Sequence, residues 1–177
     1  MKKQNACLAL LICASALLAQ SVQAESAKAA VSWNGHGQVF QVSVSEQEFL
    51  GSMDGVMYIE SSTGKLDEAF MECTVKLIMH RDDAKIRGHG NCMITESSTD
   101  TVFADYQCTG EIGACKGKFT LTGGSGRFEG ISGGSRLIVR SPLRHIIAGT
   151  GSIENIAVKN GILLLPSLSY QLPGGRK

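Results

Sequence analysis

Short apolar or β-branched runs alternate with turn clusters along most of this chain, and this pattern constrains the fold more than any other feature. No long stretch has the 3.6-residue period of an amphipathic helix. The 21 glycines in the 177 residues also disfavour helices, because each interior glycine costs a helix about 1 kcal/mol relative to alanine. Short strands separated by turns predict an all-β barrel or sandwich in a single domain. The expected strands are 38–44, 56–61, 70–79, 85–95, 101–108, 115–122, 135–141, 146–156 and a last strand within 157–170.

The first 24 residues are predicted to be a secretory signal peptide rather than part of the fold. Lys2 and Lys3 precede an apolar run over 6–19, and 22–24 has the small or β-branched residues of a cleavage site. The run is shorter than the roughly 20 residues of a membrane span, so an uncleaved anchor is the weaker alternative. We expect a domain over 25–177, with no membrane span after cleavage, in the periplasm or released from the cell.

Four cysteines follow the expected signal: Cys73, Cys92, Cys108 and Cys115. An even number of cysteines in an exported chain predicts disulfides. The alternative is a zinc site, but zinc sites use close pairs such as C-x-x-C, whereas the spacings here are 19, 16 and 7. We therefore expect two disulfides and no metal site.

Turn positions predict which cysteines face each other, because side chains opposed across an antiparallel pair follow from where the chain reverses. A turn at 82–83 places Cys73 directly opposite Cys92. A turn at 111–112 places Cys108 directly opposite Cys115. The predicted pairing is therefore Cys73–Cys92 and Cys108–Cys115, with each bridge joining neighbouring strands.

The same registers, with a turn centred on Ser98, place the apolar side chains on one face, which is the expected interior. Tyr106 is expected between Gly90 and Gly117, where its ring fills space that the glycines leave. Its hydroxyl would either orient a ligand or donate to a backbone group. The side chains expected to line the interior and contact a small hydrophobic ligand are Leu77, Met79, Ile94, Val102, Tyr106, Phe119 and Leu121.

The segment 123–133 reads GGSGRFEGISG. It resembles the GGTGRFxGAxG signature of the allene oxide cyclase and dirigent-type β-barrels, which include secreted bacterial members. The matching residues are Gly123, Gly124, Gly126, Arg127, Phe128, Gly130 and Gly133, whereas Ser125 and Ile131 depart from the signature. The resemblance implies a small antiparallel barrel of eight strands, with room for side chains or one small ligand. Phe128 is expected under the barrel rim, and Arg127 either caps carbonyls or an acid, or is a surface charge.

Two glycine motifs in this segment do not predict catalysis. Gly124 and Gly126 begin a dinucleotide-like pattern, but the third glycine is displaced and a strand follows instead of a helix. The sequence 130–134 matches G-x-S-x-G, but an all-β chain lacks the strand–turn–helix context of a nucleophile elbow.

Neither the net charge nor the positions of the histidines predict a specific binding site for nucleic acid or metal. The net charge of +1 lacks the basic surplus of a nucleic-acid-binding protein, so we expect no nucleic-acid partner. His80 and His89 are expected on the outer face as solvated side chains, with a surface metal pair as the alternative. A small basic edge is either a solvated strand face or a site for an anionic partner; it comprises Arg136, Arg140, Arg144 and His145.

The expected interior holds almost no acids or bases, and general acid–base catalysis needs a positioned titratable group. We therefore expect no catalytic residue and no cofactor, and predict an exported, non-enzymatic barrel that binds a small hydrophobic ligand or serves as an interaction module. The resemblance implies two alternatives, a cyclase or isomerase acting on an oily or polyketide-like substrate and a dirigent-like accessory protein. The sequence predicts no oligomeric state and assigns no role to Trp33, His36, Tyr58 and Glu60.

Overall fold

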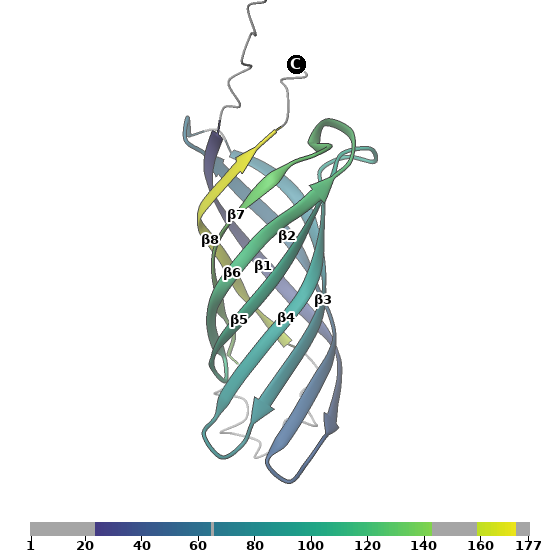
Figure 1. The fold of residues 1–177 in the computed structure, drawn as a ribbon, viewed down its shortest axis with the longest axis vertical. Helices are drawn as coiled ribbons and strands as arrows, with labels where there is room; N and C mark the ends of the chain where they lie inside the picture. Colours follow the sequence, from purple (N-terminus) through teal and green to yellow (C-terminus); the bar gives the residue numbers. More distant parts are fainter. Residues whose placement is uncertain (1–23, 65, 143–158, 173–177) are drawn as a thin grey trace, which may run out of the picture.

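The computed structural model describes residues 24–64, 66–142 and 159–172. Eight strands form a closed antiparallel barrel in which each strand pairs with its neighbours in sequence and β8 pairs with β1 (Figure 1). The predicted all-β class and eight-stranded barrel are confirmed. The strands are β1 (Ala24–Gln41), β2 (Glu46–Ser61), β3 (Leu66–His80), β4 (Lys85–Thr95), β5 (Thr101–Glu111), β6 (Ala114–Gly124), β7 (Ser132–Arg140) and β8 (Lys159–Gln171), with a short 3-10 helix, η1 (Gly126–Phe128), between β6 and β7.

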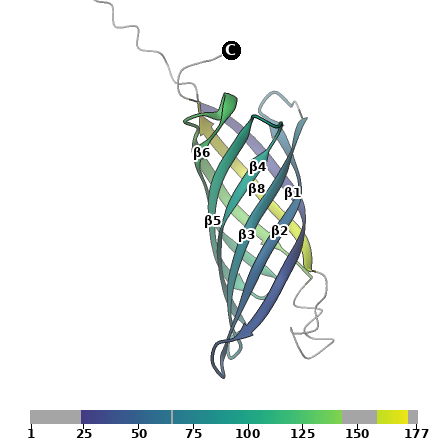
Figure 2. The same ribbon diagram turned by 90° about the vertical axis from the view of Figure 1, so that its right-hand side faces the viewer.

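The long barrel has two distinct ends (Figures 1 and 2). The lower end carries the β1–β2, β3–β4 and β5–β6 turns. The upper end carries the other described connections, including η1, together with the start of β1 and the end of β8.

The strands at the amino terminus are longer than predicted. β4 begins and ends as expected, but β1 begins at Ala24 instead of residue 38, and β2 begins at Glu46 instead of residue 56. The missed half of β1 places the small Ala27 and Ala29 in the interior. In the missed half of β2, the buried Phe49 and Met53 alternate with Gly51 and Gly55, so neither half has the bulky apolar run that predicts a strand. The expected strand 146–156 and residues 1–23 of the expected signal peptide lie outside the described residues.

Two predicted registers are confirmed and one is wrong. Cys73 lies opposite Cys92 between β3 and β4, and the β4–β5 register also agrees with the prediction. Between β5 and β6, Glu111 pairs with Ala114, so the turn is Ile112-Gly113 and the register is displaced by two residues. Gly113 permits this turn with a φ of 82°. Because side chains alternate with a period of two, the displacement leaves the same face inside.

Both predicted disulfide pairings are confirmed. Cys73–Cys92 joins directly opposed residues of β3 and β4. Cys108–Cys115 joins β5 and β6 diagonally, because Cys108 lies opposite Gly117 and Cys115 opposite Gly110. Direct opposition of Cys108 and Cys115 was therefore wrong. The two bridges indicate an oxidising, extracytoplasmic environment.

Side chains fill the middle of the barrel, as is usual for eight strands. These side chains come from every part of the chain, so strands that were predicted poorly still contribute to the core. Those buried most completely are Val31, Met57, Met71, Met79, Phe119, Leu137, Leu163 and Leu165. The described part of the chain contains no helix that is long and apolar enough to cross a membrane.

Candidate ligand-binding sites

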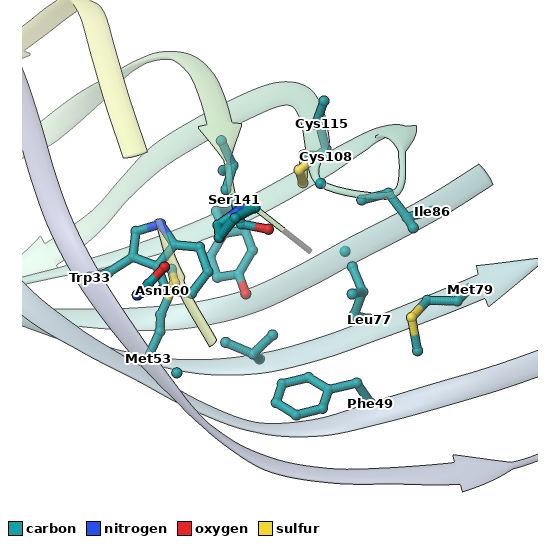
Figure 3. Close-up of a pocket in the computed structure, with 18 of the residues that line it drawn as sticks. Trp33, Phe49, Met53, Leu77, Met79, Ile86, Cys108, Cys115, Ser141 and Asn160 are labelled. Carbon is teal, nitrogen blue, oxygen red and sulfur yellow. A yellow bond between two sulfur atoms is a disulfide. The ribbon is translucent and has the colours of Figure 1, made fainter. Parts of the chain in front are cut away.

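Two separate spaces lie within the described part of the barrel, one near each end. The lower cavity has a volume of about 110 Å³, and Figure 3 shows side chains from several strands converging on it. The upper pocket is larger, at about 380 Å³, and opens beside η1. The main lining residues of the lower cavity are Trp33, Phe49, Met53, Val75, Leu77, Met79, Ile86, Tyr106, Cys108, Cys115 and Val139. Those of the upper pocket are Glu25, Met57, Ile59, Asp67, Glu68, Ile94, Glu96, Val102, Leu121, Arg127, Phe128, Ile131, Leu168 and Tyr170.

The residues expected to line one continuous interior are divided between these spaces. Leu77, Met79 and Tyr106 line the lower cavity. Ile94, Val102 and Leu121 line the upper pocket. Phe119, with 1% of its surface exposed, lines neither and belongs to the packed core. Alternation along a strand identifies the inner face, but it does not give the height at which a side chain lies along the barrel.

The lower cavity is almost entirely apolar. Two of its lining cysteines are joined as the Cys108–Cys115 disulfide, and among its described lining residues there is no acid, histidine, lysine or arginine. The polar side chains around it are Ser52, Ser141, Asn160 and the hydroxyl of Tyr106. Such a lining favours an apolar guest and offers few groups for proton transfer.

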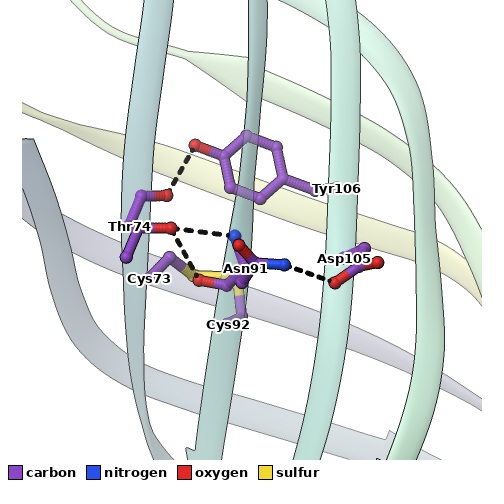
Figure 4. Close-up of a disulfide and its surroundings, with 6 residues drawn as sticks. All are labelled: Cys73, Thr74, Asn91, Cys92, Asp105 and Tyr106. Atoms are coloured by element: carbon purple, nitrogen blue, oxygen red, sulfur yellow. Dashed lines mark hydrogen bonds between the residues drawn. A yellow bond between two sulfur atoms is a disulfide. The ribbon is translucent and has the colours of Figure 1, made fainter. Parts of the chain in front are cut away.

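Tyr106 uses its hydroxyl inside the protein. The phenol donates to the carbonyl oxygen of Thr74, 3.2 Å away on β3, and Figure 4 shows it beside the Cys73–Cys92 bridge. Burial raises the pKa of this phenol well above its usual value. The interpretation of Tyr106 as a core tyrosine bound to the backbone is therefore confirmed. Its expected position between two glycines was half right, because Gly90 faces it on β4 but Phe119 faces it on β6.

Trp33 is a lining residue that the sequence left unassigned. It lies on β1 opposite Gly161 of β8, and a Cβ atom at Gly161 would lie 2.6 Å from Trp33 Cζ2. The indole therefore occupies the space above a glycine, and its buried Nε1 has no hydrogen-bond partner among the described residues. The alternation through Ala29, Val31 and Trp33 was the available signal for this inward position. His36, Tyr58 and Glu60, which were also unassigned, are exposed.

Arg127 and Phe128 lie at the rim of the upper pocket, within the segment that carries the family resemblance. The Arg127 guanidinium pairs with Glu96 and lies 3.7 Å from Asp100, whose carboxylate also accepts the Arg127 backbone N–H. It stacks 4.8 Å above the half-buried Phe128 ring. The expectation that Arg127 caps an acid is therefore confirmed, as is the placement of Phe128 beneath the rim.

A phenol–carboxylate pair joins β8 to β1 at the upper pocket. The Tyr170 hydroxyl donates to the Glu25 carboxylate at 2.6 Å. Burial raises the pKa of Tyr170 to about 12, with further contributions from the hydrogen bond and from the negative charge of Glu25. The upper pocket therefore combines an apolar floor with titratable groups, unlike the lower cavity.

No set of three or more histidine, cysteine, aspartate or glutamate side chains within the described ranges is arranged to hold a metal ion. His80 and His89 lie on the outer surface of β3 and β4, and His80 Nδ1 is 3.6 Å from a Glu46 carboxylate oxygen. Of the expected basic edge, Arg136 and Arg140 are exposed on β7. Arg144 and His145 lie outside the described residues.

Comparisons with protein-family models, with curated proteins and with solved structures found no match. The resemblance of 123–133 to the allene oxide cyclase and dirigent-type barrels therefore stays a prediction.

Proposed function

We propose that this protein is a non-enzymatic barrel that binds a small hydrophobic molecule in its lower cavity. The observation that carries the proposal is the apolar cavity lined by Trp33, Phe49 and Leu77. Binding there would remove apolar surface of the guest from water, which contributes about 25 cal/mol for each Å² buried. The guest needs no charged partner, and the cavity offers none among its described lining residues.

The size of the cavity limits the guest. An engineered apolar cavity of about 150 Å³ stays dry and binds benzene, whereas sites for drug-sized ligands measure about 300–1,000 Å³. At about 110 Å³, the lower cavity matches a single ring or a short branched chain. We therefore propose a small volatile or semi-volatile apolar compound, or the apolar end of a longer one.

Binding is favoured over catalysis because the lower cavity lacks a group suited to proton transfer. Among the described residues that line the cavity, Tyr106 has a titratable side chain. Its hydroxyl already donates a hydrogen bond to the Thr74 carbonyl oxygen, and burial raises the pKa of this phenol. A cyclase or isomerase would instead need the upper pocket, where Tyr170 and Glu25 meet apolar side chains. The hydrogen bond between Tyr170 and Glu25 also has a structural role, because it joins β8 to β1. The bond alone therefore does not favour an enzyme.

The proposal includes export by the amino-terminal signal, to the periplasm or beyond the cell. The two disulfides support it, because such bonds persist in oxidising compartments. A barrel there would hold an apolar compound that would otherwise be diluted in water or lost to membranes.

A pair of matched substitutions tests the site. Leu77→Phe adds bulk to the lower cavity, and Leu121→Phe makes the same change in the upper pocket. We expect single-ring compounds such as toluene and phenol derivatives to bind wild-type protein and Leu121→Phe alike, and to bind Leu77→Phe at least about tenfold more weakly, which corresponds to about 1.4 kcal/mol. Trp33 is the chain's single tryptophan and lines the cavity, so its fluorescence reports binding.

The result that would overturn the proposal is equal binding by both variants, or no binding of any single-ring compound by folded wild-type protein. Circular dichroism and disulfide mapping establish that each variant is folded. If Leu121→Phe alone weakened the binding of single-ring compounds, the binding site would be the upper pocket.

A further inference from the structure

The outer surface of β4, β5 and β6 is hollowed into a groove of about 780 Å³. It lies on the other side of the sheet from the lower cavity, with which it shares Gly88, Tyr106 and Cys108 as lining residues. Its charged and amide side chains, all exposed, are Arg87, His89, Asn91, Asp105, Gln107, Lys116 and Lys118, so its cations outnumber its one acid among the described residues. We call this surface the basic groove. The site described above does not use it.

Strand register, rather than sequence proximity, assembles the charges. Lys76 pairs with His89, His89 with Gln107, Gln107 with Lys118, and Lys118 with Arg136. This row therefore crosses five adjacent strands, which lie about 4.8 Å apart. A net charge close to zero does not reveal such a row, because a net charge does not show which charges lie together on the surface.

Inward-facing glycines lie behind the groove. A Cβ atom at Gly90 would overlap the carbonyl oxygen of Thr74, and one at Gly117 would overlap that of Gln107. Neighbouring backbones are therefore closer at these positions than any other residue would permit. The ring of Tyr106 covers Gly90 on the inner side of the sheet, and the long outer side chains form the walls of the groove.

The cations of the groove are not neutralised by the described part of the protein. Arg87, Lys116 and Lys118 of the groove, and Arg136 beside it on β7, form no ion pair among the described residues, whereas Lys76 of the same row pairs with Glu48. Asp105, at one end of the groove, accepts a hydrogen bond of 2.7 Å from Asn91. Like charges directly opposite on neighbouring strands, as at Lys118 and Arg136, are destabilising. An anionic partner would remove that repulsion.

We propose that the basic groove binds an acidic polysaccharide. Lys116, Lys118 and Arg87 would contact its anionic groups, and the amide of Gln107 would hydrogen bond to its hydroxyls. Single-stranded nucleic acid is less well matched, since its binding sites stack bases on exposed aromatic rings. The aromatic residue of the groove, Tyr106, has 7% of its surface exposed and directs its ring into the barrel.

The test compares Lys116→Gln/Lys118→Gln with a control, Lys28→Gln/Arg81→Gln, which removes two exposed cations outside the groove. The probe is an oligogalacturonate, and neutral dextran of the same length is the blank. Each lysine near an anionic surface contributes about fivefold to binding, so we expect the groove variant to bind about 25-fold more weakly at low ionic strength. The plot of log affinity against log salt should flatten by about 1.5, because each neutralised charge contributes about 0.7–0.9.

The control variant should bind as wild-type protein does, and dextran should bind neither. Circular dichroism establishes that both variants are folded. The proposal is overturned if wild-type protein does not bind the oligogalacturonate at low ionic strength, or if the two variants lose equal affinity. Tighter binding of a single-stranded DNA oligomer of matched charge would overturn the assignment to a polysaccharide. Toluene binding in the barrel, measured on the same samples, should be unchanged in both variants.

Discussion

The hydroxyl of Tyr106 reaches across β4 to the carbonyl oxygen of Thr74 on β3, at 3.2 Å. The intervening residue, Gly90, makes this contact sterically feasible, because a Cβ atom there would lie 2.8 Å from Tyr106 Cε1 and would overlap the Thr74 carbonyl oxygen. Three strands are therefore tied together at a position that only glycine can occupy without displacement.

Gly90→Ala should destabilise the barrel strongly. The added methyl meets backbone and a ring held by a hydrogen bond, so neither neighbour can move freely, and overpacking of this kind costs about 1–3 kcal/mol. Gly88→Ala is the matched control, since its nearest neighbour would be the flexible end of Leu77, at 3.2 Å. It should stay within about 1 kcal/mol of wild-type protein. Urea unfolding measures both, and equal losses would contradict this role for Gly90.

Tyr106→Phe should lower the free energy of unfolding by about 1 kcal/mol, the usual net value of one hydrogen bond. The ring stays in place, so the shape of the lower cavity is preserved. Toluene affinity should therefore be unchanged, as measured by Trp33 fluorescence. A large loss of affinity without a loss of stability would show instead that the phenol contacts the ligand.

The two disulfides should contribute unequally. They close loops with sequence separations of 19 and 7, for which chain entropy predicts about 3.2 and about 2.4 kcal/mol. Replacing Cys73 and Cys92 by alanine should therefore cost more than replacing Cys108 and Cys115, as measured by urea unfolding. The reverse order would show that packing of the sulfur atoms, rather than loop entropy, dominates.

Stability should fall as the pH rises from about 10 towards 12. The pKa of Tyr170 is raised to about 12 by burial and by Glu25, whereas an unfolded tyrosine ionises near pH 10. Between pH 10 and pH 12 the unfolded state has lost the Tyr170 proton while the folded state still binds it. The contribution of the Tyr170 pair to stability is therefore complete below pH 10 and is lost as the pH rises towards the folded-state pKa. Tyrosinate absorbance is measured against pH in wild-type protein and in Tyr170→Phe. The difference between the two curves, which reports Tyr170, should have its midpoint near pH 12. A midpoint near pH 10 would contradict the buried pair.

Alternation and turns predicted much of the sheet but not how its interior is used. The stretch 85–95 has strong alternation and clear turns, and both its bounds and its partners were correct. The β5–β6 register was displaced because an exposed Glu111 and a half-buried Ile112 gave no local sign of whether the chain turns before or after Ile112. Gly113, with its positive φ, decides this in the folded chain.

The division of the interior into a lower cavity and an upper pocket, and the presence of the basic groove, both depend on which residues lie side by side on neighbouring strands. Phe119 and Leu121 are two residues apart on the same face, yet one is in the core and the other lines the upper pocket. Lys118 and Arg136 are 18 positions apart in the numbering but directly paired. Which residues become neighbours across strands depends on strand tilt and on how the barrel closes. The alternation of side chains within one strand carries no information about either.

The most direct test of the proposed binding site is a crystal structure of the protein soaked with bromobenzene, with the bromine located by its anomalous scattering. We expect a peak in the lower cavity, between Trp33, Leu77 and Ile86, and no such peak in crystals of Leu77→Phe. Ordered water molecules filling that cavity, or bromine bound elsewhere while the cavity stays empty, would contradict it.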